Sequence, residues 1–219
     1  MPPKEKLAAC RLYGFVDSAY LAGRKPEKVA RMLVDGGADI IQLRAKNESR
    51  DEILAAAKTI LPITRPAGVP LIINDYPDIT EQVGADGVHL GQEDLARKSF
   101  AEVRGQLGAE KIIGVSTHSL EQALAAEKLG ADYIGVGPIF PTGTKPGRTA
   151  VGLELIRQVA AVVKIPFVCI GGINPSNVVQ VKAAGANWIA AVSAILCAED
   201  VALAAQQLQS TMAASARTE

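Results

Sequence analysis

Residues Gly36 to Arg44 read GGADIIQLR, a glycine-rich break followed by an acidic residue and an apolar run. The same phrase recurs three times, as VGADGVHLG (83–91), LGADYIGVG (129–137) and AGANWIAAV (184–192). Glycine supplies the left-handed residue that ends a helix, and an apolar run rich in β-branched residues is typical of a buried strand. Each phrase therefore predicts the end of a helix and the beginning of a strand.

Four further apolar runs precede or separate these phrases. They are RLYGFVD (11–17), VPLIIND (69–75), KIIGVST (111–117) and IPFVCIG (165–171). Helix signals fill the gaps between the runs. Segments 49–52 and 119–122 each begin with Ser and end with Glu or Gln, the spacing of a capping box. Asn174, followed by a proline, is expected to cap another helix.

Strands that alternate with helices pair in parallel, and near-continuous apolar strands are buried on both faces. Eight βα units within one chain of 219 residues predict an α/β fold, a single-domain (β/α)8 TIM barrel. The alternative is an open doubly wound sheet, which the even eight-fold count disfavours. We expect one domain over residues 1–219, with its core at about 11–214 and loose ends.

The composition excludes several classes of partner. The 23 basic residues balance the 23 acidic ones, which argues against broad contact with nucleic acid or an anionic membrane. Only 4% of the residues are aromatic, so base-stacking platforms are not expected. The three Cys are widely spaced, without a metal-ligand pattern, and are expected to be reduced thiols. With no apolar signal-peptide core at the N-terminus, the protein is expected in the cytoplasm. We expect it to act on small molecules, and a homo-oligomer is possible.

The second strand ends in polar residues, at the barrel end where this fold places its active sites. Strand alternation puts Gln42, Arg44 and Lys46 on one face. Two cations that point into a barrel mouth are costly without an anionic partner. The alternative for Lys46 is a solvated loop residue.

Two acidic residues follow the next two strands. Asp75 comes directly after Asn74, and Asp94 ends the segment GVHLGQED (87–94). Neighbouring strands lie about 4.8 Å apart, so the two carboxylates could share one hard cation such as Mg²⁺. The alternative for Asp94 is a helix cap, and His89 on the same strand is interpreted as structural.

The later strands end in residues suited to an anion. The loops after strands seven and eight commonly bind phosphate in this fold, and here they carry Gly172 and Ser193. Ser116 stands at the mouth of strand five. His118 beside it is either an acid/base group or a solvated turn residue.

Strand six leads into the loop PTGTKPGRT (141–149). Thr142 and Thr144 have hydroxyls for phosphate oxygens, and Lys145 adds a positive charge. Glycines at 143 and 147 allow the loop to close. The loop is therefore interpreted as a phosphate clamp and lid that reaches both anion sites.

Taken together, these segments resemble the thiamine phosphate synthase family. The resemblance runs from about Leu12 to Ala198 and is carried by IIQLRAK, LIINDY, GADGVHLGQEDL, GVSTHS, DYIGVGPIFPTGTK, IGGI and VSAI, in that order. It implies a transferase that joins a hydroxymethylpyrimidine diphosphate to a thiazole phosphate, releasing pyrophosphate with the help of one Mg²⁺ per subunit.

The resemblance also implies roles for individual residues. The pyrimidine diphosphate contacts it implies are Gln42, Arg44, Lys46, Asn74, Ser116 and Lys145. The thiazole phosphate contacts it implies are Thr142, Gly143, Thr144, Gly172, Val192 and Ser193. Asp75 and Asp94 look like the metal ligands, and Arg44, Lys145 and Ser116 look like the catalytic residues. Tyr76 departs from the family, which often has Arg there. Trp188, where many relatives are smaller, is expected to pack among the outer helices.

The implied mechanism needs no nucleophilic side chain, because the electron-rich aminopyrimidine can stabilise the cation left when pyrophosphate departs. Two alternatives stay open. One is a thiazole tautomerase of the same fold, which would use His118 and would not need the carboxylate pair. The other is a non-catalytic sensor of a phosphate ligand, since fold alone does not decide function.

Overall fold

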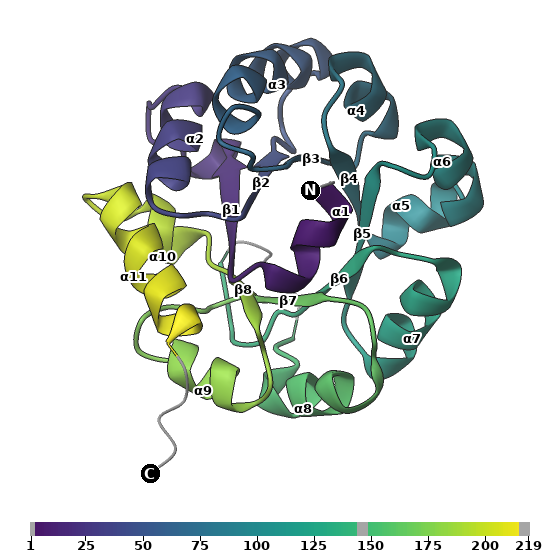
Figure 1. Ribbon diagram of the computed structural model, residues 1–219, viewed down its shortest axis with the longest axis vertical. Helices are drawn as coiled ribbons and strands as arrows, with labels where there is room; N and C mark the ends of the chain where they lie inside the picture. Colours follow the sequence, from purple (N-terminus) through teal and green to yellow (C-terminus); the bar gives the residue numbers. More distant parts are fainter. Residues whose placement is uncertain (1–2, 144–148, 215–219) are drawn as a thin grey trace.

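Eight parallel strands close into one barrel (Figure 1). The structure, a computed structural model, describes residues 3–143 and 149–214. The strands are β1 (Leu12–Asp17), β2 (Ile40–Arg44), β3 (Leu71–Asn74), β4 (Gly87–Leu90), β5 (Ile112–Thr117), β6 (Tyr133–Val136), β7 (Phe167–Ile170) and β8 (Trp188–Ala190). Neighbours pair in chain order, and β8 closes on β1. The predicted (β/α)8 barrel is confirmed, and the open doubly wound sheet is wrong.

Helices surround the ring of strands (Figure 1). They are α2 (Pro26–Asp35), α3 (Arg50–Thr64), α4 (Pro77–Val83), α5 (Gln92–Arg97), α6 (Phe100–Leu107), α7 (Leu120–Leu129), α8 (Gly152–Val162), α9 (Val178–Ala183), α10 (Ser193–Leu196) and α11 (Val201–Ala213). Two short 3-10 turns, η1 (Leu7–Ala9) and η2 (Ser18–Tyr20), flank β1. None of the helices in the described part of the chain has both the length and the apolar character that a membrane crossing requires.

The N-terminal helix α1 (Pro3–Lys6) lies over the centre of the strand ring in Figure 1. Lys4 forms an ion pair of 2.8 Å with Asp132, which precedes β6. The Lys6 ammonium group donates to the carbonyl of Gly68, which precedes β3, at 2.7 Å. Both partners lie before the strands, so α1 covers the amino-terminal end of the barrel and leaves the other end open.

The repeated phrase has a structural reason at each of its occurrences. The glycine before Ala is left-handed in all four, with φ of 80°, 68°, 89° and 112° at Gly37, Gly84, Gly130 and Gly185. In three of them the following Asp accepts a backbone N–H from the start of the preceding strand. These bonds join Asp39 to Leu12, Asp86 to Leu71 and Asp132 to Ile113, at 2.9, 2.8 and 2.7 Å. The repeat therefore ends a helix and fastens two strand beginnings together.

The predicted helix caps are only partly as expected. Ser49 and Glu52 form the complete capping box at the start of α3. Ser119 accepts from the backbone of Gln122, but the Gln122 side chain accepts from His118 N instead of the cap itself. The prediction for Asn174 is wrong, because α9 begins at Val178. Asn174 Oδ1 instead accepts from Ser176 N and forms a turn before the helix.

Aromatic side chains fill the inside of the barrel. The Trp188 ring centroid lies 5.5 Å from that of Tyr13 and 5.3 Å from that of Tyr133. The expectation that Trp188 packs among the outer helices is therefore wrong, since β8 turns this side chain inward. Room for the cluster comes from Gly114, because a Cβ at that position would lie 2.1 Å from Cζ of Tyr133. The interior is a packed layer of rings that forms the floor below the strand ends.

Gly114→Ala is expected to destabilise the protein by about 1–3 kcal/mol or more, because the added methyl group forces Tyr133 out of position. Gly105→Ala is the matched control: it lies exposed within α6, where a Cβ would meet no described atom within 4 Å. That change should stabilise by about 0.5–1 kcal/mol, because alanine is the better helix former. Urea unfolding of both variants measures the difference. Equal effects at the two positions would contradict this account of the barrel interior.

Candidate active site

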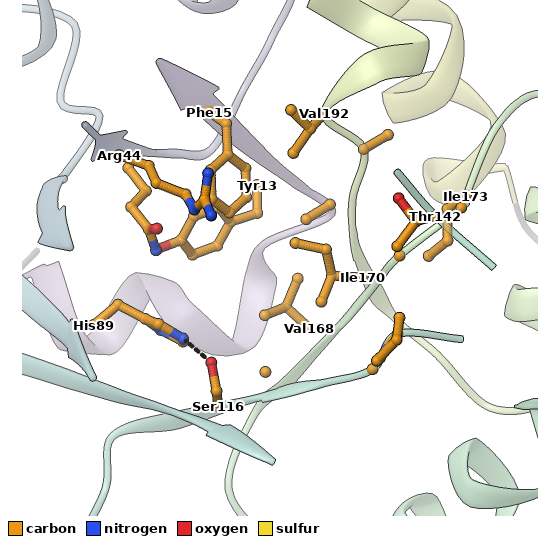
Figure 2. A pocket seen from close by; sticks show the side chains of 18 of the residues that line it. Tyr13, Phe15, Arg44, His89, Ser116, Thr142, Val168, Ile170, Ile173 and Val192 are labelled. Atoms are coloured by element: carbon orange, nitrogen blue, oxygen red, sulfur yellow. Dashed lines mark hydrogen bonds between the residues drawn. The ribbon is translucent and has the colours of Figure 1, made fainter. Parts of the chain in front are cut away.

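A cavity opens near the carboxyl ends of the strands, and all eight strands contribute to it (Figure 2). Its wall is made by Tyr13, Phe15, Gln42, Arg44, Asn74, His89, Ser116, His118, Gly135, Gly137, Pro138, Thr142, Val168, Ile170, Gly171, Gly172, Ile173, Ala190, Ala191, Val192 and Ser193. Polar groups stand mainly on β2 to β5, and small and apolar ones on β6 to β8. The cavity therefore has two chemically different sides.

Arg44 is held in the cavity wall by a carboxylate that the sequence analysis missed. Its Nη1 lies 2.7 Å from Oδ2 of Asp17, and the two residues are direct partners in the β1–β2 register. Asp17 is fully buried, and its Oδ1 also accepts from Ala19 N at 3.1 Å. A buried ion pair orients the guanidinium, whose side chain keeps 12% of its surface exposed for a ligand.

Lys46, Asp75 and Asp94 form a charged cluster after β2, β3 and β4, and Asp75 directly follows the lining residue Asn74. Lys46 Nζ lies 3.1 Å from Oδ2 of Asp75. Asp75 adopts a left-handed backbone with φ of 66°, a conformation that costs energy for a residue with a side chain. Its N–H donates to the carbonyl of His89 at 2.9 Å, which fixes this conformation at the strand end.

The Asp94 carboxyl lies within hydrogen-bonding reach of Asp75 and also accepts from Gly91 N at 2.8 Å. Burial raises the pKa of Asp94 above its ordinary value, and the nearby Asp75 charge raises it further. Asp94 therefore closes the first turn of α5 and faces Asp75 at the same time. Two carboxylates this close, with only Lys46 as a described cationic partner, are poised for a cation.

The opposite side of the cavity depends on glycine. Gly171 and Gly172 have φ of 102° and 65°. A Cβ on Gly172 would lie 2.7 Å from Cβ of Phe140 and 2.8 Å from the carbonyl of Pro141. The backbone after β7 thus approaches the segment after β6 closely. This contact brings Thr142 into one wall with Val192 and Ser193, which come from the junction of β8 and α10.

His89 and Ser116 form a hydrogen-bonded pair in the wall (Figure 2). His89 Nε2 and Ser116 Oγ lie 2.9 Å apart, and His89 Nδ1 lies 2.9 Å from the hydroxyl of Tyr133. The interpretation of His89 as purely structural is therefore incomplete. His118 also lines the cavity, with Nδ1 against the carbonyl of Gly137.

The structure brings most of the predicted residues together. Gln42, Arg44, Asn74, Ser116, Thr142, Gly172, Val192 and Ser193 line the cavity. Lys46, Asp75 and Asp94 lie close to one another and follow β2, β3 and β4, but they are not part of the cavity lining. Gly143 is exposed beside Thr142. Thr144 and Lys145 lie outside the described residues. Tyr76 precedes α4, and its ring lies 5.2 Å below the guanidinium of Arg50.

Asp17, Tyr13 and Tyr133 are the residues that sequence reasoning missed. Asp17 is the last residue of β1, so the strand-end criterion used for the other strands would have found it. Tyr13 and Tyr133 stand at the starts of their strands, away from the carboxyl ends, and gave no such signal. Their role appears only once the barrel closes and places β1 and β6 across from each other.

The fold and the cavity define a (β/α)8-barrel enzyme with its site at the strand ends. A sequence model of the family described as thiamine monophosphate synthase matches residues 12–195. The thiamine-phosphate synthase of Shouchella clausii is 47% identical over 203 residues, which cover 92% of this chain and 96% of that protein. The chain belongs to the thiamine monophosphate synthase family and is a transferase of that type.

Two further relatives agree with this assignment. The thiamine-phosphate synthase of Chloroflexus aurantiacus is 46% identical over 200 residues, which cover 91% of each protein. The solved thiamine phosphate pyrophosphorylase from Pyrococcus furiosus has a TM-score of 0.83 at 37% identity, covering 96% of this chain and 97% of that one. The predicted family and fold are therefore confirmed by sequence and by structure.

The Asp17–Arg44 pair should respond unequally to loss of its two members. Arg44→Met leaves a fully buried carboxylate without its cation and is expected to cost about 3–5 kcal/mol. Asp17→Asn leaves a cation that can turn toward the cavity, so about 1–3 kcal/mol is expected. The double variant should be less unstable than the sum of the two. Urea unfolding measures the free energy of unfolding of all three variants. Equal losses in the two single variants, or a double-variant loss equal to their sum, would contradict a buried pair.

Asp94→Asn is expected to raise the stability of the metal-free protein. A raised pKa in the folded state means that wild-type stability is highest when Asp94 is protonated and falls as pH rises through that pKa. The asparagine cannot ionise, so its advantage should grow as the pH rises from about 4, the ordinary Asp pKa, through the raised pKa of the folded state. Urea unfolding in EDTA measures the gap at each pH. Asp51→Asn, at an exposed position on α3, is the control. A stability difference between Asp94→Asn and wild type that does not change with pH would contradict a raised pKa of Asp94 beside Asp75.

Proposed function

We propose that the protein joins 4-amino-2-methyl-5-(diphosphooxymethyl)pyrimidine to 4-methyl-5-(2-phosphooxyethyl)thiazole, giving thiamine phosphate and pyrophosphate. One observation carries the proposal. A single cavity has Arg44 on one side, where the cluster of Lys46 and the paired carboxylates follows the same and the next two strands, and a glycine-lined wall with hydroxyls on the other. Such a cavity suits two phosphate-bearing substrates that must meet.

The pyrimidine diphosphate is assigned to the side built by β2, β3 and β5. Gln42 and Asn74 offer amide groups to the aminopyrimidine, whose ring carries both donors and acceptors. Arg44, Lys46, Ser116 and Lys145 are assigned to the diphosphate oxygens. Arg44 is fixed by Asp17, so its charge is already oriented before the substrate binds.

Asp75 and Asp94 would hold the Mg²⁺, one per subunit. The fit rests on their chemistry, because two carboxylates in mutual contact, one of them with a raised pKa, gain from a hard cation between them. In the described part of the chain no cluster of three or more His, Cys, Asp or Glu side chains competes for it. When bound, Mg²⁺ would neutralise charge on the departing pyrophosphate as a Lewis acid.

The thiazole phosphate is assigned to the opposite wall. Gly172 places backbone groups at the surface, and Thr142 and Ser193 add hydroxyl donors, as suits a monophosphate. Gly143, Thr144 and Val192 complete the proposed contacts. The phosphate anchored there would aim the thiazole ring at the pyrimidine across the cavity.

The reaction is proposed to be a dissociative substitution. The bond from the pyrimidine methylene carbon to the diphosphate oxygen breaks, and its electron pair leaves with pyrophosphate. The electron-rich aminopyrimidine stabilises the resulting cation, and the thiazole nitrogen then supplies the electron pair for the new carbon–nitrogen bond. Arg44, Ser116 and Lys145 act by stabilising the negative charge that develops on the leaving group. The cavity walls hold the two rings in line.

We place this activity in the cytoplasm, which agrees with three cysteines that are all free thiols. Assembly into a homo-oligomer is part of the same proposal. The thiazole tautomerase stays as an alternative because His118 lines the cavity. A tautomerase would need neither the carboxylate pair nor the Asp17–Arg44 ion pair, so the synthase is favoured.

The test combines purified protein, both substrates and Mg²⁺, and follows thiamine phosphate after oxidation to fluorescent thiochrome. Product should appear, and EDTA should abolish it. An Asp75→Asn/Asp94→Asn variant should lose at least about 10²-fold in turnover, because charge stabilisation of a leaving group is commonly worth that much.

Asp51→Asn is the matched control and should keep wild-type turnover. Product that persists in EDTA and in the double variant would remove the metal site from the proposal. No product from folded protein would reject the synthase, and the thiazole phosphate alone would then be assayed for tautomerisation.

A further inference from the structure

A chain of hydrogen bonds crosses the barrel at the floor of the cavity, and four of its five side chains line that cavity. Gln42 Nε2 donates to the Tyr13 hydroxyl at 2.8 Å, and the Tyr13 and Tyr133 hydroxyl oxygens lie 2.8 Å apart. Tyr133 then meets His89 Nδ1, and His89 Nε2 meets Ser116 Oγ, both at 2.9 Å. Five side chains from β2, β1, β6, β4 and β5 are thus linked. Gln42 and Ser116, at the two ends of this hydrogen-bonded chain, are proposed substrate contacts.

The middle of this chain is closed to water. Tyr13 is 1% exposed and Tyr133 is fully buried. Burial raises the pKa of both phenols well above the ordinary value, so both keep their protons. Each hydroxyl therefore has one proton to donate.

Counting protons gives the chain a direction. The Tyr13 oxygen already accepts from Gln42, and within residues 3–143 and 149–214 its only other hydrogen-bonding neighbour is Tyr133. The Tyr13 proton must therefore go to Tyr133. The Tyr133 proton must then go to His89 Nδ1, so the ring proton of a neutral His89 lies on Nε2 and is donated to Ser116.

We propose that Tyr13 and Tyr133 hold His89 as the Nε2–H tautomer. All three are positioning residues, and through His89 they aim the Ser116 hydroxyl proton into the cavity. The proposal rests on the proposed function in one respect, that Ser116 meets the diphosphate. With its oxygen accepting from His89, Ser116 keeps its own proton for an anion. In the opposite direction Ser116 would donate to His89 and present lone pairs to the diphosphate, which repel it.

The packing around the chain is built for this arrangement. Gly114 makes room for the Tyr133 ring, and a Cβ on Gly135 would already touch His89 Cε1 at 3.4 Å. The Trp188 ring packs against both tyrosines. The groups that set the direction therefore have little freedom to turn.

The first experiment reads the tautomer of His89 directly, without substrates. The chain has only two histidines, so long-range ¹H–¹⁵N spectra of protein labelled at the histidine ring nitrogens give two sets of signals. A His118→Gln variant assigns them. At about pH 8, above the ordinary histidine pKa of about 6.5, His89 should be the Nε2–H tautomer. The Nδ1–H tautomer, or an exchanging mixture of the two, would overturn the proposal.

Tyr133→Phe removes the donor to His89 and should convert the single tautomer into a mixture. Tyr13→Phe should shift it less, because Tyr133 keeps its own proton. Tyr20→Phe is the matched control, because it removes a tyrosine hydroxyl that is not part of this series of hydrogen bonds. The His89 signals of that variant should match those of the wild type. An unchanged His89 in Tyr133→Phe would show that the tyrosines do not set the tautomer.

Kinetics connect the tautomer to catalysis. Tyr133→Phe should lower kcat about three- to tenfold, the worth of one hydrogen bond that is misdirected, with little change in KM for the thiazole phosphate. An unchanged kcat beside a mixed tautomer would overturn the positioning role. If wild-type protein makes no product while His89 is the Nε2–H tautomer, the synthase proposal fails and the hydrogen-bond direction stands.

Discussion

Closure of the eight strands forces alternate residues of every strand into one shared interior, and the other features of the site depend on how that interior is filled. Here bulky rings from β1, β6 and β8 are accommodated by a glycine on β5. Tyr133 occupies the space that any side chain at position 114 would need. The resulting aromatic layer is rigid. The polar residues further along each strand therefore stand on a layer of side chains that does not move. Arg44, Asn74 and Ser116 can be held where a ligand will need them because the layer below cannot collapse.

The charged groups above this layer are arranged at some cost to stability. Asp17 gives up all contact with water to orient Arg44. Asp75 and Asp94 repel each other, and Asp75 also adopts a left-handed backbone. The proximity of the two carboxylates is unfavourable in the free protein and would become favourable if a cation bound between them. This is the expected character of a site that is organised before its substrates bind, and the repeated bonds at the opposite end of the barrel, such as Asp39 to Leu12, contribute the compensating stability.

The fold could be predicted from the sequence because its signals are local. A left-handed glycine, an acidic residue and an apolar run specify a helix end and a strand start without knowledge of distant residues, and Gly84 and Gly130 confirm this. Residues at strand ends were found for the same reason, since parallel strands bring their ends to one edge. Trp188 could not be placed, because a one-residue choice of strand face is decided by which neighbours leave space. The tyrosine pair was missed because its partners lie 120 residues apart in the chain.

The series of hydrogen bonds from Gln42 to Ser116 joins two walls of the barrel that no direct contact between these two residues joins. Gln42 and Ser116 stand on different walls of the barrel, and a ligand that touches both would gain little if the walls could move independently. A chain that runs through two buried phenols and an imidazole connects these walls entirely through residues on strands. Strands hold geometry more tightly than loops do, so the orientations of Gln42 and Ser116, the two proposed substrate contacts, are set by the same buried core. In this barrel the core therefore does more than stabilise the fold: it determines which way a hydroxyl proton in the active site points.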